Sequence, residues 1–260
     1  MTDELLRLTV LGSATPYPSA DNPCSGYLLS SGSTRVWVDA GSGTLGPLQR
    51  YCGLDELDAV WISHLHADHS ADLLTAFYGA MYADIRLDAP IPLYGPPGIA
   101  DRLAGFLTNA LVRSPIESAF DVTELYDGHD VTVGSVRLTS REVAHGIPAF
   151  ALRAEAAGGT LVYSGDTAPC ASLTALADSC DVLLCEADSA EPVEGHHTPE
   201  DAGDTAGAAR VGRLIVTHVG RSLTPQQAVA RAATRFNGPI DHAAPGLTFD
   251  ITRRDGNRPC

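Results

Sequence analysis

The spacing of apolar residues divides the chain into candidate strands and helices. Residues 5–11 alternate between apolar and polar side chains, which predicts a first strand. Residues 27–29 and 35–38 predict a hairpin that turns at Ser31-Gly32-Ser33. Strands are also predicted over residues 131–143 and 149–154, and Ser70 is expected to cap a helix.

Later in the chain, apolar runs that predict strands alternate with patterns that predict helices. Helices are expected over residues 170–179, 199–210 and 225–236, with strands over 181–185 and 213–217. We found no internal repeat and no linker. Early hairpins followed by alternating strands and helices predict an α/β fold with helices packed outside two sheets. We therefore expect residues 1–260 to form a single four-layer αββα domain.

Composition narrows the range of partners. The chain has 17 basic and 32 acidic side chains, with a formal charge of −15. A non-specific nucleic-acid binder needs a basic surface, so large nucleic acids are not the expected partners. No apolar run approaches ~18 residues, which argues against a membrane span. The acidic start of the chain is unlike a secretory signal, and six cysteines without a C-x-x-C pair suggest free thiols. A cytoplasmic protein is expected.

One short segment contains several side chains that can bind metal ions. Ser63-His64-Leu65-His66-Ala67-Asp68-His69 places three histidines and one aspartate within six residues, directly after a predicted strand. Side chains two positions apart in an extended segment point the same way, so His64 and His66 can bind one ion. Asp68 and His69 then face a second ion. Imidazole and carboxylate ligands suit Zn²⁺, with Fe or Mn as alternatives.

Further candidate ligands follow other predicted strands. His145, Asp166 and His218 each stand at the carboxyl end of an apolar run. Ligands on several strand ends converge at one edge of a sheet. These three residues are therefore expected to complete two metal shells.

The whole set, H-x-H-x-D-H followed by a lone His, a G-D-T and a T-H, resembles the metallo-β-lactamase superfamily of di-metal hydrolases. The resemblance implies an αββα sandwich and two zinc ions, with Mn²⁺ or Fe²⁺ as alternatives. It also implies that Asp166 bridges the ions and that Asp39 supports the site from below. The implied ligands are His64, His66, His145 and Asp166 for metal 1, and Asp68, His69, Asp166 and His218 for metal 2.

Residues 181–187, together with His197-Thr198, resemble the ribonuclease Z branch of that superfamily. The resemblance implies a relay from Glu186 through His197 to Asp68. His197 is expected to protonate the leaving group, and His196 is a rival for that role. Thr198 and Pro199 are expected to begin a helix just after it.

The implied substrate is small. Only 20 residues separate His145 from Asp166, so the long arm that ribonuclease Z uses to hold transfer RNA is missing. The chain is more similar to compact bacterial phosphodiesterases that cleave cyclic nucleotides. This resemblance implies a homodimer that hydrolyses a small phosphodiester or nucleotide with a metal-bridging hydroxide. The alternatives are a transfer RNA 3′-end endonuclease, a lactone or thioester hydrolase, and a non-catalytic metal-bound scaffold.

Overall fold

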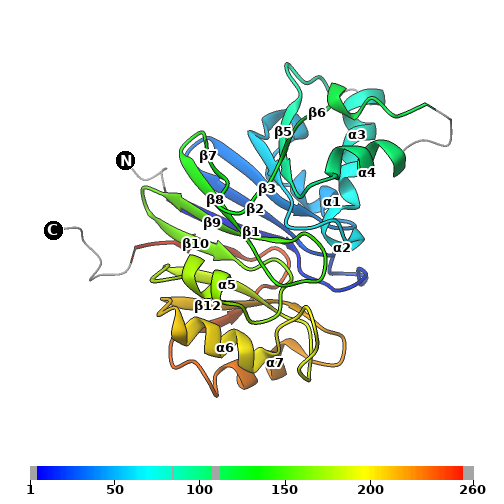
Figure 1. Ribbon diagram of the computed structural model, residues 1–260. Coiled ribbons are helices and arrows are strands. Elements are labelled where there is room, and N and C mark those ends of the chain that lie inside the picture. Colours follow the sequence, from blue (N-terminus) through cyan, green and yellow to red (C-terminus); the bar gives the residue numbers. More distant parts are fainter. Residues whose placement is uncertain (1–4, 84, 107–111, 254–260) are drawn as a thin grey trace.

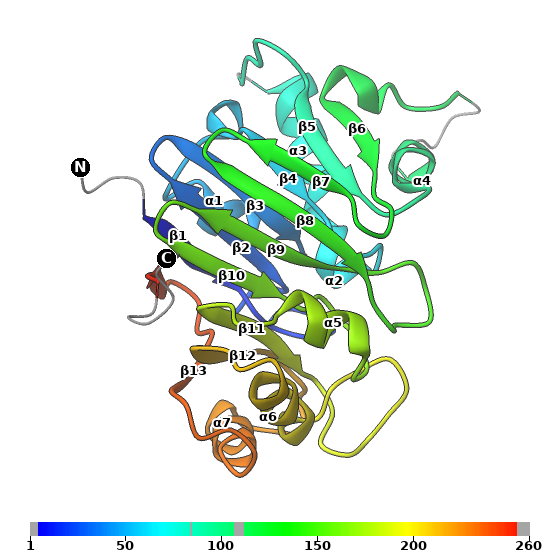
Figure 2. The same cartoon turned by 60° about the vertical axis from the view of Figure 1, so that its left-hand side comes forward.

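Two seven-stranded sheets lie face to face at the centre of the fold (Figures 1 and 2). The computed structural model describes residues 5–83, 85–106 and 112–253. Along the first sheet the strand order is β14-β1-β2-β3-β4-β5-β6, and along the second it is β13-β12-β11-β10-β9-β8-β7. Each sheet is mixed, with antiparallel hairpins at one end and parallel strands at the other.

The strands of the first sheet are β1 (Leu6–Gly12), β2 (Gly26–Ser31), β3 (Thr34–Ala40), β4 (Ala59–Trp61), β5 (Ile91–Gly95), β6 (Phe120–Glu124) and β14 (Thr248–Ile251). Those of the second are β7 (Asp130–Val133), β8 (Val136–Glu142), β9 (Phe150–Ala156), β10 (Gly159–Tyr163), β11 (Val182–Ala187), β12 (Arg213–Val219) and β13 (Ile240–His242).

Helices cover the outer face of each sheet. The first sheet packs against α1 (Leu45–Leu48), α3 (Asp72–Tyr82) and α4 (Ile99–Phe106), and the short helix α2 (Ala67–Ser70) follows β4. The second packs against α5 (Ala171–Leu176), α6 (Pro199–Ala208) and α7 (Pro225–Ala232). Two single turns of 3₁₀ helix cover Leu54–Glu56 and Ile116–Ser118. The predicted four-layer αββα architecture is confirmed.

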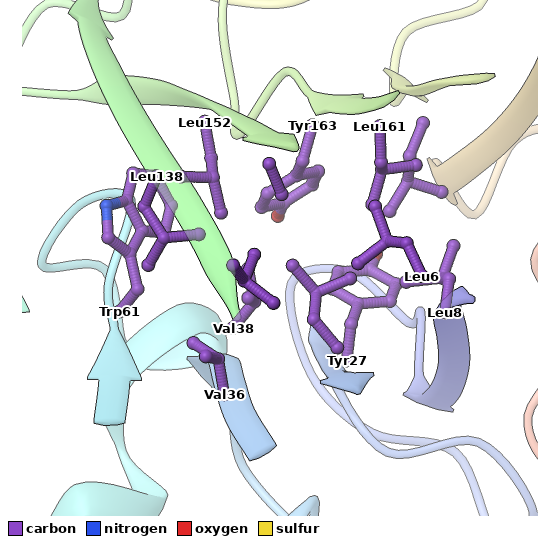
Figure 3. Packing of buried hydrophobic residues seen from close by; sticks show 14 of the residues in the cluster. Leu6, Leu8, Tyr27, Val36, Val38, Trp61, Leu138, Leu152, Leu161 and Tyr163 are labelled. Carbon is purple, nitrogen blue, oxygen red and sulfur yellow. The ribbon is translucent and has the colours of Figure 1, made fainter. Parts of the chain in front are cut away.

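Three apolar cores hold these layers together. Leu8, Tyr27, Leu152 and Tyr163 belong to the core between the sheets (Figure 3). The other two cores lie between each sheet and its helices. Successive strand residues point to opposite faces, so a central strand contributes to two cores at once. This explains why β4, β10 and β11 are nearly continuous apolar runs in the sequence.

Strand β3 shows how one strand serves two cores. Val36 and Val38 enter the core between the sheets, whereas Trp37 enters the core beneath the helices. All three side chains are at most 1% exposed. Burying such side chains contributes about 1.5–3 kcal/mol each relative to leaving them in water.

Some local predictions were wrong. The segment 131–143 is not one strand but the hairpin β7–β8, which turns at Gly134 with a φ of 54°. Glycine suits this left-handed conformation because it has no Cβ. Ser70 does not cap a helix from outside; it ends α2, and its hydroxyl donates to the carbonyl of His66. Strands β6 and β13 were not predicted. That residues 1–260 form a single domain stays a prediction.

Candidate metal centre

The segment after β4 brings four polar side chains to one end of the first sheet. His64 and His66 lie in the connection from β4, and Asp68 and His69 lie in α2. Asp68 is tied down through its backbone, because its carbonyl accepts a hydrogen bond from the amide of Ser25 at 3.1 Å. This segment therefore presents its side chains from a fixed loop.

The second sheet contributes one residue at a time. His145 follows β8, Asp166 follows β10, and His218 lies near the end of β12. Strands β10, β11 and β12 are parallel neighbours, so their carboxyl ends meet at one edge. Ligand sites form at such edges in α/β proteins. The same edge carries Glu186, near the end of β11.

Four of these side chains form a first cluster. The Nε2 of His64 lies 3.0 Å from the Nδ1 of His66, which in turn lies 3.1 Å from the Nε2 of His145. The Oδ2 of Asp166 is 3.7 Å from the Nε2 of His64. His64 is fully buried, and Asp166 is 2% exposed.

A second cluster lies beside the first and shares Asp166. The Nε2 atoms of His69 and His218 are 3.2 Å apart. The Oδ2 of Asp68 lies 3.3 Å from His218 Nε2, and the Oδ1 of Asp166 lies 3.2 Å from His69 Nε2. Each cluster thus combines two residues after β4 with two from the second sheet.

The spacing within the clusters fits metal coordination. Four ligands arranged as a tetrahedron about a zinc ion at 2.0–2.2 Å are separated from one another by about 3.3–3.6 Å. The separations given above range from 3.0 to 3.7 Å. The structure thus brings all seven predicted ligands together at one place. His64, His66, His145 and Asp166 form one possible metal group, Asp68, His69 and His218 form a second, and Asp166 and His218 form a third with His196. Which of these residues bind metal stays a prediction.

Outer hydrogen bonds orient the imidazoles. The Nδ1 of His64 is 3.0 Å from the hydroxyl of Ser63, and the Nδ1 of His145 is 2.8 Å from the carbonyl of Gly195. The Nδ1 of His69 is 2.7 Å from the carboxylate of Asp39. Each bond leaves Nε2 facing the cluster, which is how ligating histidines are held in metalloproteins.

Asp39 supports the site from beneath. It is completely buried, and its carboxylate accepts hydrogen bonds from the amide and hydroxyl of Ser63 and from the hydroxyl of Tyr163. With His69, four donors surround this one side chain. Its backbone φ is 53°, and that of His218 is 47°. Left-handed backbone at residues other than glycine costs of order 1–3 kcal/mol and clusters at functional sites.

The electrostatics of the site favour cations. Burial alone raises the pKa of Asp166, but His218 and His69 outweigh it and hold the pKa well below its ordinary value. Burial likewise raises the pKa of Asp68, and His218 and His69 reverse that shift. Both carboxylates therefore stay ionised. The Oδ1 of Asp166 is buried and accepts no well-aligned hydrogen bond from any described residue, as a metal ligand would. These residues fit a pair of metal ions.

Glu186 pairs with His196 rather than with His197. The Nδ1 of His196 lies 3.2 Å from both oxygens of the Glu186 carboxylate. Glu186 is fully buried and also accepts the amides of Thr167 and Asp188 at 2.7 and 3.2 Å. Burial raises the pKa of Glu186 to about 7. Burial lowers the pKa of His196, but the bond to Glu186 outweighs it and raises the pKa to about 9. The pair therefore holds a proton at neutral pH.

The structure does not bring His197 to the clusters. Its side chain is fully buried, with Nδ1 bonded to the carbonyl of Thr167 and Nε2 3.2 Å from the hydroxyl of Thr205 on α6. Both ring nitrogens are occupied by the protein. The predicted relay also differs at its other end, because Asp68 contacts His218.

A pocket of about 480 Å³ opens over the clusters. His66, Asp68, Asp166 and His218 line it together with His196, whose side chain is 24% exposed. The further lining residues are Thr15, Pro16, Ala67 and Asp188. Asp188 was not predicted, although it stands two positions after Glu186, where a strand side chain points to the same face.

Comparison with known proteins identifies the family. Residues 34–219 match the model described as the Beta-lactamase superfamily domain. The chain belongs to the beta-lactamase superfamily. An uncharacterized protein of Mycobacterium leprae is 36% identical to this chain over 255 residues, which is 95% of this chain and 89% of that protein.

Two further similar proteins indicate the branch of the superfamily to which the chain is related. A protein named Ribonuclease Z from Mycobacterium bovis is 29% identical over 91% of this chain and 95% of its own length. The crystal structure of the metallo-beta-lactamase fold protein YhfI from Bacillus subtilis matches with a TM-score of 0.83 and 26% identity, covering 95% of this chain and 99% of that one. The resemblance to the ribonuclease Z-like branch of the superfamily is confirmed.

Proposed function

We propose that this protein is a two-metal hydrolase that cleaves small phosphodiesters, nucleotides among them, with His196 as the proton donor. The observation that carries the proposal is the pair of ligand clusters that both contact Asp166, with His196, held by Glu186, on the wall of the same pocket. A phosphodiester is anionic, and the three carboxylates lining the pocket would repel it unless cations were present.

The proposed metal ligands are those that the sequence analysis named, and zinc is the proposed ion. Nitrogen and carboxylate ligands in groups of four suit zinc. When bound, two such ions neutralise phosphate oxygens and lower the pKa of water towards 7. Asp166 would contact both ions because it belongs to both clusters.

The remaining chemistry belongs to side chains of the chain. Charge develops on the leaving oxygen as the bond to phosphorus breaks, and a positioned acid speeds that step by 10²–10⁴-fold. His196 holds its Nδ1 on Glu186 and lines the pocket, so its Nε2 would be the atom that protonates the leaving group. Glu186 stabilises the charged imidazolium and holds the backbone after Asp166. Glu186 is therefore a positioning residue.

A product assay with metal-loaded protein tests this function. We expect about two metal equivalents per chain, hydrolysis of bis-p-nitrophenyl phosphate and of cyclic AMP, and loss of both activities on chelation. Hydrolysis of an acyl-homoserine lactone with no activity on either phosphodiester would favour the lactone or thioester alternative. Two bound metals with no activity on any substrate would favour the scaffold alternative.

Cleavage of precursor transfer RNA is the second candidate. The relative named Ribonuclease Z supports it, since the match covers nearly both chains. The charge of −15 argues for small substrates instead. Precursor transfer RNA therefore belongs in the same assay, where efficient cleavage at one site would make it the better assignment.

Assembly and location also stay predictions. A homodimer is expected, and the mass in solution by light scattering tests it. Within the described residues, no helix is long and apolar enough to cross a membrane. The cytoplasmic location is tested by fractionating cells that produce the protein.

A further inference from the structure

A tyrosine and an arginine stack against each other on two loops whose neighbouring residues line the pocket. The Cζ of Arg221 lies 4.2 Å from the centre of the Tyr17 ring, and both side chains are exposed. Tyr17 directly follows Pro16, and Arg221 comes three residues after His218; both Pro16 and His218 line the pocket. Such a contact over an aromatic face steadies a guanidinium group.

The two loops that carry this pair are anchored to the same residue. The hydroxyl of Thr15 donates to the Oδ1 of Asp188 at 3.1 Å. Gly220 packs so closely on Asp188 that a Cβ there would lie 1.7 Å from the Asp188 carbonyl oxygen. Because Asp188 itself lines the pocket, both loops are fixed relative to the ligand clusters.

Arg221 is also held from its carboxyl side. The amide of Leu223 donates to the carbonyl of Gly220 at 2.9 Å, which closes a turn with Arg221 inside it. Thr224 then caps α7 by accepting the amide of Gln227. The backbone of Arg221 is thus fixed between β12 and α7.

Among the residues that the structure describes, Arg221 has no carboxylate partner. No carboxylate of the described residues lies within 4.0 Å of its guanidinium, whereas other arginines of this half, such as Arg213 and Arg231, form ion pairs. The neighbouring pocket is rich in carboxylates. One face of the guanidinium is on Tyr17, and its donor groups are available to an anion beside the pocket.

We propose that Arg221, held in place by Tyr17, binds a second phosphate group of the substrate. The preferred substrates would then be nucleotides that carry one phosphate in addition to the phosphodiester that is cleaved. An arginine can bind the oxygens of a phosphate through two parallel hydrogen bonds. The inference rests on the proposed function, because the scissile phosphodiester is placed at the ligand clusters.

A matched pair of substrates tests it. The p-nitrophenyl ester of thymidine 5′-phosphate would be compared with the same ester carrying a 3′-phosphate, so that only the second phosphate differs. For the native protein we expect a higher kcat/KM on the 3′-phosphorylated ester. Arg221→Gln should lower kcat/KM on that ester by ~10-fold or more, and on the plain ester by less than ~2-fold.

The tyrosine has its own pair of variants. Tyr17→Leu removes the ring and should lower the preference for the 3′-phosphorylated ester over the plain ester by ~2–5-fold. Tyr17→Phe keeps the ring and should leave that preference unchanged. Arg102→Gln, an exposed arginine on α4, controls for the loss of one positive charge and should leave the preference unchanged.

Calorimetric binding of thymidine 3′,5′-bisphosphate and thymidine 5′-phosphate supplies a readout that needs no turnover. Tighter binding of the bisphosphate that depends on Arg221 would support the inference. Lack of hydrolysis of both esters would refute the proposed function, and the binding result would still stand. Equal effects of Arg221→Gln on both esters and both nucleotides would overturn the inference and leave the hydrolase assignment intact.

Discussion

The two sheets contribute to the candidate metal centre in different ways. The first sheet delivers four ligands from a single loop and one turn of helix after β4. The second delivers His145, Asp166 and His218 from three separate connections or strand ends. The first set depends on local backbone geometry. The second set exists as a set only when strands β8 to β12 are correctly paired.

Because of this difference, substitutions in the two halves of the site are expected to disturb the ligands in different ways. A change in the β4 loop is expected to act on the ligands themselves. A change in the second sheet acts through residues that hold several strand ends in register, such as Glu186, which bonds to the amides of Thr167 and Asp188. Variants that affect one half and not the other can therefore measure the contribution of each sheet to metal binding and hydrolysis.

The largest effect is expected for Asp166→Ala. This variant removes the one residue that belongs to both clusters, so bound metal should fall from about two equivalents to less than one. Hydrolysis should fall by at least ~10³-fold, because the stabilisation of phosphate charge is lost. Elemental analysis and a rate measurement check this. Retention of two metals would show that the second sheet does not supply the shared ligand.

A smaller and more selective effect separates the adjacent histidines. His196→Ala should keep both metals and lose ~10²-fold or more in kcat/KM on cyclic AMP, whose leaving group needs a proton. It should lose little on bis-p-nitrophenyl phosphate, whose leaving group is stable as an anion. The ratio of the two losses is the quantity to measure.

His197→Ala is the matched control for that experiment. It removes a buried ring with two hydrogen bonds, so the free energy of unfolding should fall by ~2–4 kcal/mol. The ratio of rates on the two substrates should stay that of the native protein. If His197→Ala changed the ratio and His196→Ala did not, the assignment of the proton donor would be reversed.

Asp39→Asn probes the support beneath the first sheet's loop. An amide cannot accept all four donors that surround the carboxylate, so His69 should lose its fixed orientation. Loss of such an outer partner typically costs 10–100-fold in metal affinity. Competition with a chelator measures the change, and the His196-dependent ratio of rates should be unaffected. An unchanged affinity would mean that the loop holds His69 without Asp39.

The smallest effect is expected at a helix cap. Thr198→Ala removes the hydroxyl that accepts the amide of Asp201 at the start of α6 and should cost about 1 kcal/mol in the free energy of unfolding. Thr224→Ala at α7 is the matched control, with the same type of cap and a similar expected loss. Metal content should not change in either. A loss of metal only in Thr198→Ala would tie α6 to the centre.

The sequence predicted the loop ligands more securely than their arrangement. His64 to His69 could be recognised because the residues are consecutive and their chemistry is unusual. His145, Asp166 and His218 could be placed because each ends an apolar run, which is how the carboxyl ends of neighbouring strands appear in a sequence. Their division between two metal ions came from the family resemblance and stays a prediction; the structure brings the side chains together, and it also places His196 beside Asp166 and His218.

The choice between His196 and His197 shows what the sequence could not decide. Adjacent side chains in an extended segment point in opposite directions, so one of the two had to face away from the other. Which one faces the pocket depends on how the loop before α6 lies against Thr167 and Thr205. Those contacts join residues 30 and 8 positions away from His197, and no local pattern encodes them.

The equal division of each cluster between the two sheets also bears on the stability of the whole fold. An ion that binds only when both sheets are in place acts as a cross-link between them, and its binding free energy adds to that of folding. At a free metal concentration 100 times the dissociation constant, this linkage is worth ~2.7 kcal/mol for one site. The melting temperature of the protein should therefore follow the free metal concentration, as it would for a structural zinc protein.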